Sequence, residues 1–114
     1  MKKTGAGVDA ENVALAFLES ADLTLVERNY RSRFGEIDLV MRDGRTLVFV
    51  EVRMRSNTLF GGAAASVTRT KQERIIATAN QFLSGRSDSP PCRFDVVLLS
   101  GGEILEWIRD AFAA

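Results

Sequence analysis

The stretch that most constrains the fold of this chain is Gly35–Arg53, which has the pattern of two β-strands joined by a tight turn. Before the turn, apolar residues alternate with charged ones, as in a strand with one exposed face. Residues 47–52 are mostly β-branched or aromatic, a composition that packs well on a pleated sheet. Between them, Asp43-Gly44 is a strong hairpin signal, because glycine accepts a positive φ angle. The sequence therefore predicts an antiparallel strand pair around which the rest packs.

The predicted turn determines which charged side chains share a face. With Asp43-Gly44 as a two-residue turn, Glu36 faces Glu51 directly and Asp38 lies diagonally from Glu51. Directly opposed Cβ atoms are about 5 Å apart and diagonal ones about 7 Å. Because side chains alternate along a strand, these three carboxylates project from one face, and Arg53 projects beside them.

Such a patch of carboxylates needs a compensating positive charge. Like charges facing each other across a strand pair are destabilising, and Glu51 interrupts a run that otherwise has the apolar character of a buried strand. A buried carboxylate without a partner costs several kcal/mol or loses its charge. Mg²⁺ or Mn²⁺ would compensate, and Arg53 would do so in part. The alternative is an ordinary solvated hairpin face; the interrupted apolar run favours a site.

Composition excludes several classes of function. At 114 residues, the chain (1–114) is expected to be one domain with one core. The 15 basic and 15 acidic residues balance, so binding to a polyanion would depend on local clusters of arginine and lysine. Histidine is absent, which excludes histidine general bases, histidine-containing catalytic triads and histidine-ligated zinc.

The chain ends and the single cysteine carry little signal. No apolar run approaches the roughly 20 residues of a membrane helix, and Met1–Gly7 is Gly-rich, as in a flexible arm, without the core of a signal peptide. We therefore expect a cytoplasmic protein with no membrane partner. Cys92 cannot form an internal disulfide and is expected to be a small buried residue where a strand starts.

A first helix is predicted from Asp9, as its capping residue, to about Ser20. Glu11 lies close to the apolar stripe of this helix, where it can point at the carboxylate patch as an outer metal ligand. The alternative is that Glu11 complements the dipole at the start of the helix.

The segment that leads into the hairpin is locally basic. A strand is predicted over Leu23–Asn29, and Arg28–Phe34 then interleaves three arginines with two aromatic residues. Arginine contacts phosphate bidentately and aromatic rings stack on bases, so Arg31 and Arg33 are candidate nucleic-acid contacts. The alternative is a solvated loop edge.

Two further basic positions follow the hairpin. Arg55 precedes the small residues of Phe60–Ala65, which are typical of a flexible loop beside a site or of close backbone packing. A capping box at Thr70–Glu73 begins a second helix that ends near Gly85, and its first turn exposes Lys71 and Gln72.

The remaining segments complete a mixed sheet. Arg93–Ser100 has the apolar character of an interior parallel strand, and a right-handed crossover places it parallel to Thr46–Arg53. Glu103–Ile108 is predicted as a short edge strand, and Ile108–Phe112 is expected to close the core. The predicted order is α-β-β-β-α-β-β, an α/β fold with helices on a mixed sheet.

Several segments together resemble a known family. The similarity to the uncharacterised YraN-like family of bacterial proteins is carried by ENVALAFLES, RNYRSRFGEIDL, GEIDLVMRDGRTLVFVEVRMRS and RFDVV. That family in turn resembles the Holliday-junction-resolvase branch of the PD-(D/E)XK nuclease superfamily. The resemblance implies a restriction-endonuclease-like fold, in which an acid on one strand and an E-X-K on the next hold Mg²⁺ and activate water.

The resemblance assigns roles residue by residue. Asp38 is the first acid, Glu51 is the glutamate of E-X-K, and Arg53 stands at the lysine position. Glu36 and Glu11 match acids common in the family, in the outer metal shell.

Arg53 is a departure from the family pattern. Lysine can lose its proton and help deprotonate water, whereas arginine stays charged. Arg53 can still neutralise charge on a phosphate. Lys71 is an alternative source of an amine.

The leading hypothesis is a metal-dependent phosphodiesterase that cleaves DNA, in preference to RNA, with branched or damaged DNA as the substrate. Asp38, Glu51 and the Val52 carbonyl would hold Mg²⁺ or Mn²⁺. The predicted nucleic-acid contacts are Arg31, Arg33, Arg55, Lys71 and Gln72. A homodimer would supply two sites for two cuts. The alternatives are a binding module that lost turnover, and a protein-interaction partner that uses the edge strand near Trp107.

Overall fold

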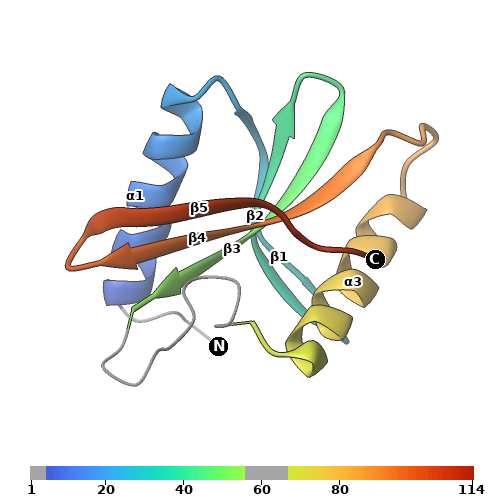
Figure 1. Cartoon of the computed structure of the whole chain (residues 1–114). Coiled ribbons are helices and arrows are strands. Elements are labelled where there is room, and N and C mark those ends of the chain that lie inside the picture. Colours follow the sequence, from blue (N-terminus) through green and yellow to red (C-terminus); the bar gives the residue numbers. More distant parts are fainter. Residues whose placement is uncertain (1–4, 56–66) are drawn as a thin grey trace.

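The computed structural model describes residues 5–55 and 67–114 as a five-stranded sheet flanked by two helices (Figure 1). The elements in chain order are α1 (Gly5–Ser20), β1 (Thr24–Ser32), β2 (Gly35–Asp43), β3 (Thr46–Met54), α3 (Arg69–Ser84), β4 (Cys92–Ser100) and β5 (Glu103–Phe112). This order confirms the predicted α-β-β-β-α-β-β layout. Among the described residues, no helix is long and apolar enough to cross a membrane.

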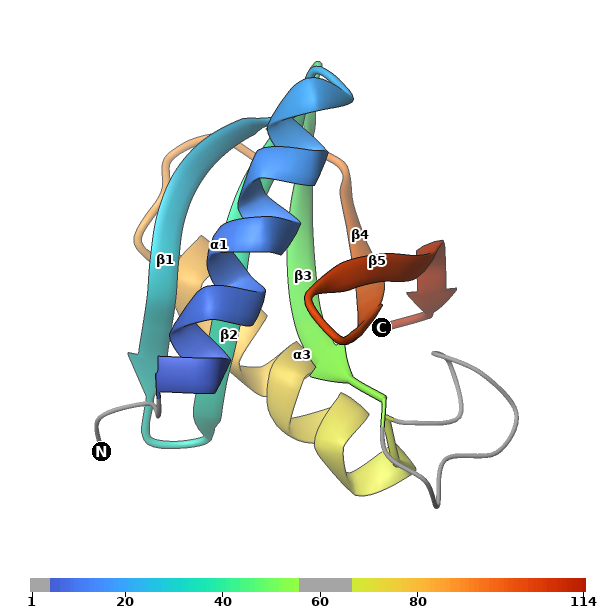
Figure 2. The same ribbon diagram turned by 90° about the vertical axis from the view of Figure 1, so that its left-hand side faces the viewer.

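The sheet is mixed, as predicted. Its strand order is β1-β2-β3-β4-β5, and every neighbouring pair is antiparallel except β3 and β4, which run parallel. Two parallel neighbours require a crossover connection, and α3 lies within that connection. Figure 2 shows α1 in front of the sheet with α3 behind it, so the two helices cover opposite faces.

The central strand β3 contributes side chains to two core layers. Leu47 and Phe49 pack toward α3, whereas Val48 and Val50 pack toward α1. Phe49 also meets Phe82 of α3 edge to face, with ring centroids 5.9 Å apart. Burial on both faces explains the almost unbroken apolar run of this strand. Glu51 is therefore a carboxylate in a strand with no solvated face, only 5% exposed.

The predicted hairpin is present, but its turn is displaced by one residue. Asp43 pairs with Thr46, so Gly44, at φ 61°, and Arg45 form the turn in place of Asp43-Gly44. Asp43 instead ends β2, where its carboxylate accepts a hydrogen bond from Arg93 at 2.9 Å. The predicted opposition of Glu36 to Glu51 is therefore wrong. The pairing shifts by two residues, an even number, so the paired residues 39–43 and 46–50 keep their predicted faces.

Both helices begin earlier than predicted. Residues 5–7 belong to α1 and not to a flexible arm, and Asp9 lies inside the helix, so its capping role is wrong. The glycines of this segment disfavour a helix only by about 1 kcal/mol each, which packing of the apolar face offsets. In α3 the cap is Thr68, whose hydroxyl accepts a hydrogen bond from the Lys71 N–H at 3.2 Å, in place of the predicted box at Thr70–Glu73.

The C-terminal half follows the prediction with two differences. Strand β5 continues to Phe112, and both Ile108 and Phe112 pack against the core, as expected. Cys92 begins β4 as predicted, but the prediction that it is buried is wrong, since it is exposed at the start of the strand. The predicted Phe60–Ala65 loop lies outside the described residues.

Asp95 is a buried polar group that the sequence pattern did not single out. It is fully buried in β4 and accepts hydrogen bonds from the Arg93 guanidinium, the Trp107 indole N–H and the Asp110 backbone N–H, each at 3.0 Å. These bonds join β4 to β5 across a bulge. Trp107 also packs edge to face on Phe17 of α1, so this side chain belongs to the core.

We expect Asp95→Ala to destabilise the protein by about 3 kcal/mol, because it removes a fully buried acceptor from three donors, one of them the charged Arg93 guanidinium. Urea denaturation measures the change. Asp88→Ala, which removes an exposed carboxylate paired with Arg86, is the matched control and should leave the midpoint unchanged. Equal midpoints for the two variants would contradict the structural role of Asp95.

Candidate metal centre

Three carboxylates from two elements converge at one end of β2. Glu11 from α1 and Glu36 and Asp38 from β2 each offer an oxygen that lies within 4.8 Å of the others. Glu11 and Asp38 are buried, at 2% and 7% exposure. The structure thus brings Glu11 to the carboxylate patch, which was one of the two predicted roles for this residue.

A break in side-chain alternation at Asp38 makes this convergence possible. Ile37 packs in the α3 layer, whereas Leu39 packs in the α1 layer, although an uninterrupted strand would place both on one face. On the neighbouring strand, the Arg28–Leu39 and Tyr30–Ile37 pairs flank Asn29, which has a positive φ of 54°. Asp38 therefore lies where the side chains of β2 change from one face of the sheet to the other, and it can contact groups from both helix layers.

Glu51 lies on the other side of Asp38. Leu39 of β2 pairs with Val50 of the antiparallel strand β3. Asp38, which precedes Leu39, and Glu51, which follows Val50, therefore lie beside this pair on the same side of it. The Asp38 carboxylate accepts a hydrogen bond from the Val52 N–H at 2.8 Å. In a strand, the N–H and C=O of one residue point to the same side, so the Val52 carbonyl, a predicted metal ligand, also faces β2.

Lys71 provides the closest positive charge. Its ammonium nitrogen, in the first turn of α3, lies 2.9 Å from Glu51 Oε2. Lysine 71 was predicted both as a nucleic-acid contact and as an alternative amine, and the structure brings it directly to the glutamate.

The electrostatics of Glu51 show that this charge does not fully compensate the carboxylates. Burial, and then the hydrogen bond and negative charge of Asp38, raise the pKa of Glu51 to about 8, against the lowering effect of Lys71. Glu51 therefore holds a proton at neutral pH unless a further positive charge lies beside it.

The predicted arginines are distributed unevenly around the centre. Arg31 Nε contacts Glu36 Oε2 at 2.8 Å and so belongs to the cluster. Arg53 follows Glu51 on β3, and its Nε is buried with no hydrogen-bond partner among the described residues. Arg33 and Arg55 are exposed. Gln72 donates to the Val67 carbonyl at 3.1 Å, a contact that anchors the start of α3.

Two residues contact Glu11 that the sequence analysis did not predict as its partners. Asn29 Nδ2 donates to Glu11 Oε1 at 3.2 Å, and Arg28 Nη2 lies 3.6 Å from the same oxygen. The signal that could have found them is the asparagine within a predicted strand. Asparagine is a poor strand former, but it tolerates the left-handed conformation observed here.

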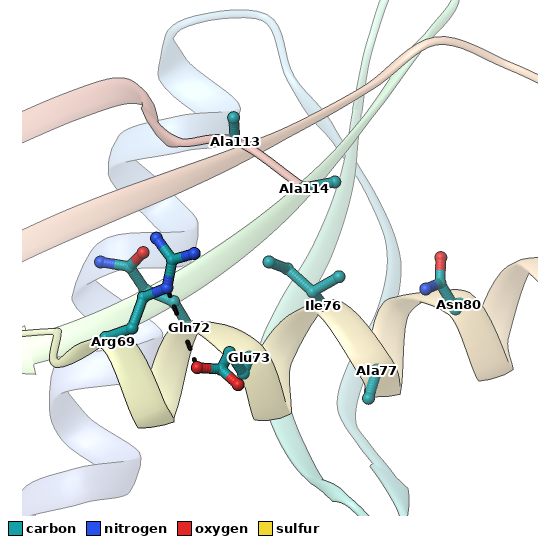
Figure 3. Close-up of a pocket in the computed structure, with 8 residues that line it drawn as sticks. All are labelled: Arg69, Gln72, Glu73, Ile76, Ala77, Asn80, Ala113 and Ala114. Carbon is teal, nitrogen blue, oxygen red and sulfur yellow. Dashed lines mark ion pairs between the residues drawn. The ribbon is translucent and has the colours of Figure 1, made fainter.

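A cavity of about 630 Å³ lies along α3 (Figure 3). Its lining includes Arg69, Gln72 and Ile76 together with Ala113 and Ala114 at the C-terminal end. None of the clustered carboxylates lines it. The carboxylates and not the cavity therefore locate the candidate centre.

The fold and the carboxylate cluster together define a small α/β protein with a candidate metal centre. Residues 10–99 match the family described as Uncharacterised protein family UPF0102, and the chain belongs to that family. This membership confirms the predicted family resemblance.

Three relatives illustrate how far the similarity extends. A UPF0102 protein of Nitrosomonas europaea is 60% identical over 108 residues, which cover 93% of this chain and 92% of the relative. One from Methylobacillus flagellatus is 56% identical over 110 residues (95% and 96%). One from Janthinobacterium sp. is 50% identical over 109 residues (96% and 88%). The similarity therefore includes the candidate centre.

We expect the stability of the protein in a metal chelator to fall as pH rises from about 5 to 8. The pKa of Glu51 is higher in the folded state, at about 8, than its ordinary value of 4.5. The folded state therefore holds a proton that the unfolded state has lost, and stability decreases by at most about 1.4 kcal/mol per pH unit. Urea denaturation across this pH range measures the slope.

Glu51→Gln should flatten that slope, because its side chain does not titrate. Glu103→Gln, which changes an exposed glutamate on β5, is the control and should keep the wild-type slope. Equal slopes for wild type and E51Q would refute the assignment of the proton to Glu51.

Proposed function

We propose that this protein is a divalent-metal-dependent nuclease that hydrolyses phosphodiester bonds in DNA. The observation that carries the proposal is the meeting of Asp38, Glu51 and Lys71 at the end of β3. Two acids and an amine are the groups that the PD-(D/E)XK resemblance requires, and here the amine lies 2.9 Å from the second acid.

The donor set fits a hard divalent cation. The clustered ligands are carboxylate oxygens, which Mg²⁺ and Mn²⁺ prefer, and the chain has no histidine to select zinc. The raised pKa of Glu51 is a second indication, because a cation beside the two acids would offset their repulsion. Asp38, Glu51 and the Val52 carbonyl would hold the ion, with Glu36 and Glu11 in the outer shell. When bound, the ion would lower the pKa of a water and neutralise charge on the phosphate.

Lys71 has the protonation chemistry that Arg53 lacks. A lysine amine can exchange a proton with a bound water, whereas a guanidinium stays charged. As the free amine, Lys71 would accept a proton from the attacking water beside Glu51. Arg53 would keep the electrostatic part of the role, by neutralising charge that develops on the phosphate.

DNA is the favoured substrate because the resemblance is to resolvases of branched DNA. The net charge of the chain is zero, so contact with the phosphate backbone would rest on local cations, including Arg33 and Arg55. Two cuts in a branched substrate require two active sites, which a homodimer in the cytoplasm would supply.

A non-catalytic nucleic-acid-binding module is the second candidate function. Arginine at position 53, in place of the lysine of E-X-K, favours it. This alternative would give salt-dependent binding that does not change when divalent cations are removed.

We expect the wild-type protein to nick supercoiled plasmid and a synthetic four-way junction with Mg²⁺ or Mn²⁺, and to do neither in chelator. Asp38→Asn and Lys71→Met should each slow cleavage by about 100-fold or more, since each removes a metal ligand or a proton-transfer group. Asp88→Asn, at an exposed aspartate far along the sequence, is the matched control.

Gel assays of product formation measure these rates. Binding without cleavage under every metal condition would favour the non-catalytic alternative. Cleavage by D38N at the wild-type rate would show that the activity belongs to a contaminant and would remove the proposal.

A further inference from the structure

The turn between β1 and β2 presents an aromatic side chain to solvent. Phe34 is 39% exposed, and it is the only aromatic residue among the exposed large apolar side chains of the described part of the chain. Single exposed apolar residues are common. What distinguishes Phe34 is how it is held and what lies beside it.

The turn is fixed in place by contacts with α3. The Phe34 N–H donates to Ser32 Oγ at 3.0 Å, and Ser32 Oγ lies 3.0 Å from the hydroxyl of Thr78, a fully buried residue of α3. Helix α3 also carries Lys71, which contacts Glu51. The aromatic side chain is therefore presented by a pre-organised turn, so that a ligand would not need to order it.

A cation accompanies the ring. The Arg33 guanidinium lies over Phe34, 4.9 Å from the ring centroid. The guanidinium covers one face of the ring, so a base would stack on the opposite face while the arginine contacts a phosphate.

The turn also lies at the same end of the sheet as the carboxylates. Figure 2 shows the β1–β2 turn at the end where β3 finishes and α3 begins. Phe34 precedes Asp38 by four residues, which is roughly 13 Å of extended chain. About four nucleotides span this length at the 3.4 Å rise of one DNA strand.

We propose that this turn stacks an unpaired base on Phe34 while Arg33 contacts its phosphate, and so directs single-stranded segments to the carboxylates. The inference rests on the proposed nuclease function and adds the substrate class: DNA with unpaired bases, such as a single strand, a gap or an open junction. An intact duplex keeps its base faces covered and does not offer this contact.

Fluorescence anisotropy tests the inference, with one labelled oligonucleotide measured alone and as a duplex, both in chelator. Phe34→Ala should weaken single-strand binding by about 5- to 150-fold, the range of one lost base stack, and leave duplex affinity within about twofold. Phe34→Trp should keep the wild-type values. Leu105→Ala, which removes another exposed apolar side chain, is the matched control and should change neither affinity.

Three results would overturn the inference: no binding of single strands by wild type, no effect of F34A, or an equal loss for both oligonucleotides. The nuclease proposal is tested separately by D38N, which should bind single strands as wild type does but not cleave them. If F34A cleaves plasmid at the wild-type rate and binds single strands with wild-type affinity, the base contact is refuted and the nuclease proposal is not. If the wild-type protein never cleaves, but F34A loses single-strand affinity, the nuclease proposal is refuted and the base contact is not.

Discussion

The interaction on which the candidate centre depends is the enforced proximity of two buried acids, Asp38 and Glu51. Glu51 lies in the central strand of a sheet covered on both faces, where an isolated carboxylate is costly. Lys71 contacts it, yet the pKa of Glu51 remains raised to about 8. A fold selected only for stability would favour an apolar residue at this position. A carboxylate at this position is therefore best explained by chemistry, and we propose a cation as the partner of the two acids.

The fold supplies this proximity through an irregularity and not through a regular element. Asn29 takes a left-handed conformation beside Asp38, and the side chains of β2 change faces there. Asp38 can then contact Glu11 from the α1 side and lie beside Glu51 on the α3 side. Strain and broken alternation of this kind are expected to concentrate where a protein performs its function.

The sequence was informative where the signal was local. The alternation before the turn and the apolar run after it predicted the hairpin, and residues 39–43 kept their predicted faces because the pairing moved by an even number of residues. The change of faces at Asp38 was not predicted. The contacts of Asp95 and Arg28 could not be predicted, because each depends on a partner brought close only by the tertiary fold. The start of α1 was misplaced for a related reason, since packing of its apolar face outweighed the weak helix propensity of glycine.

The most direct test of this account is a crystal soaked with Mn²⁺ at about pH 8 and read by anomalous scattering. The account predicts one strong peak in contact with carboxylate oxygens of both Asp38 and Glu51, and no such peak in Asp38→Asn crystals. Mn²⁺ bound only elsewhere, with no density in contact with Asp38 or Glu51, would contradict it.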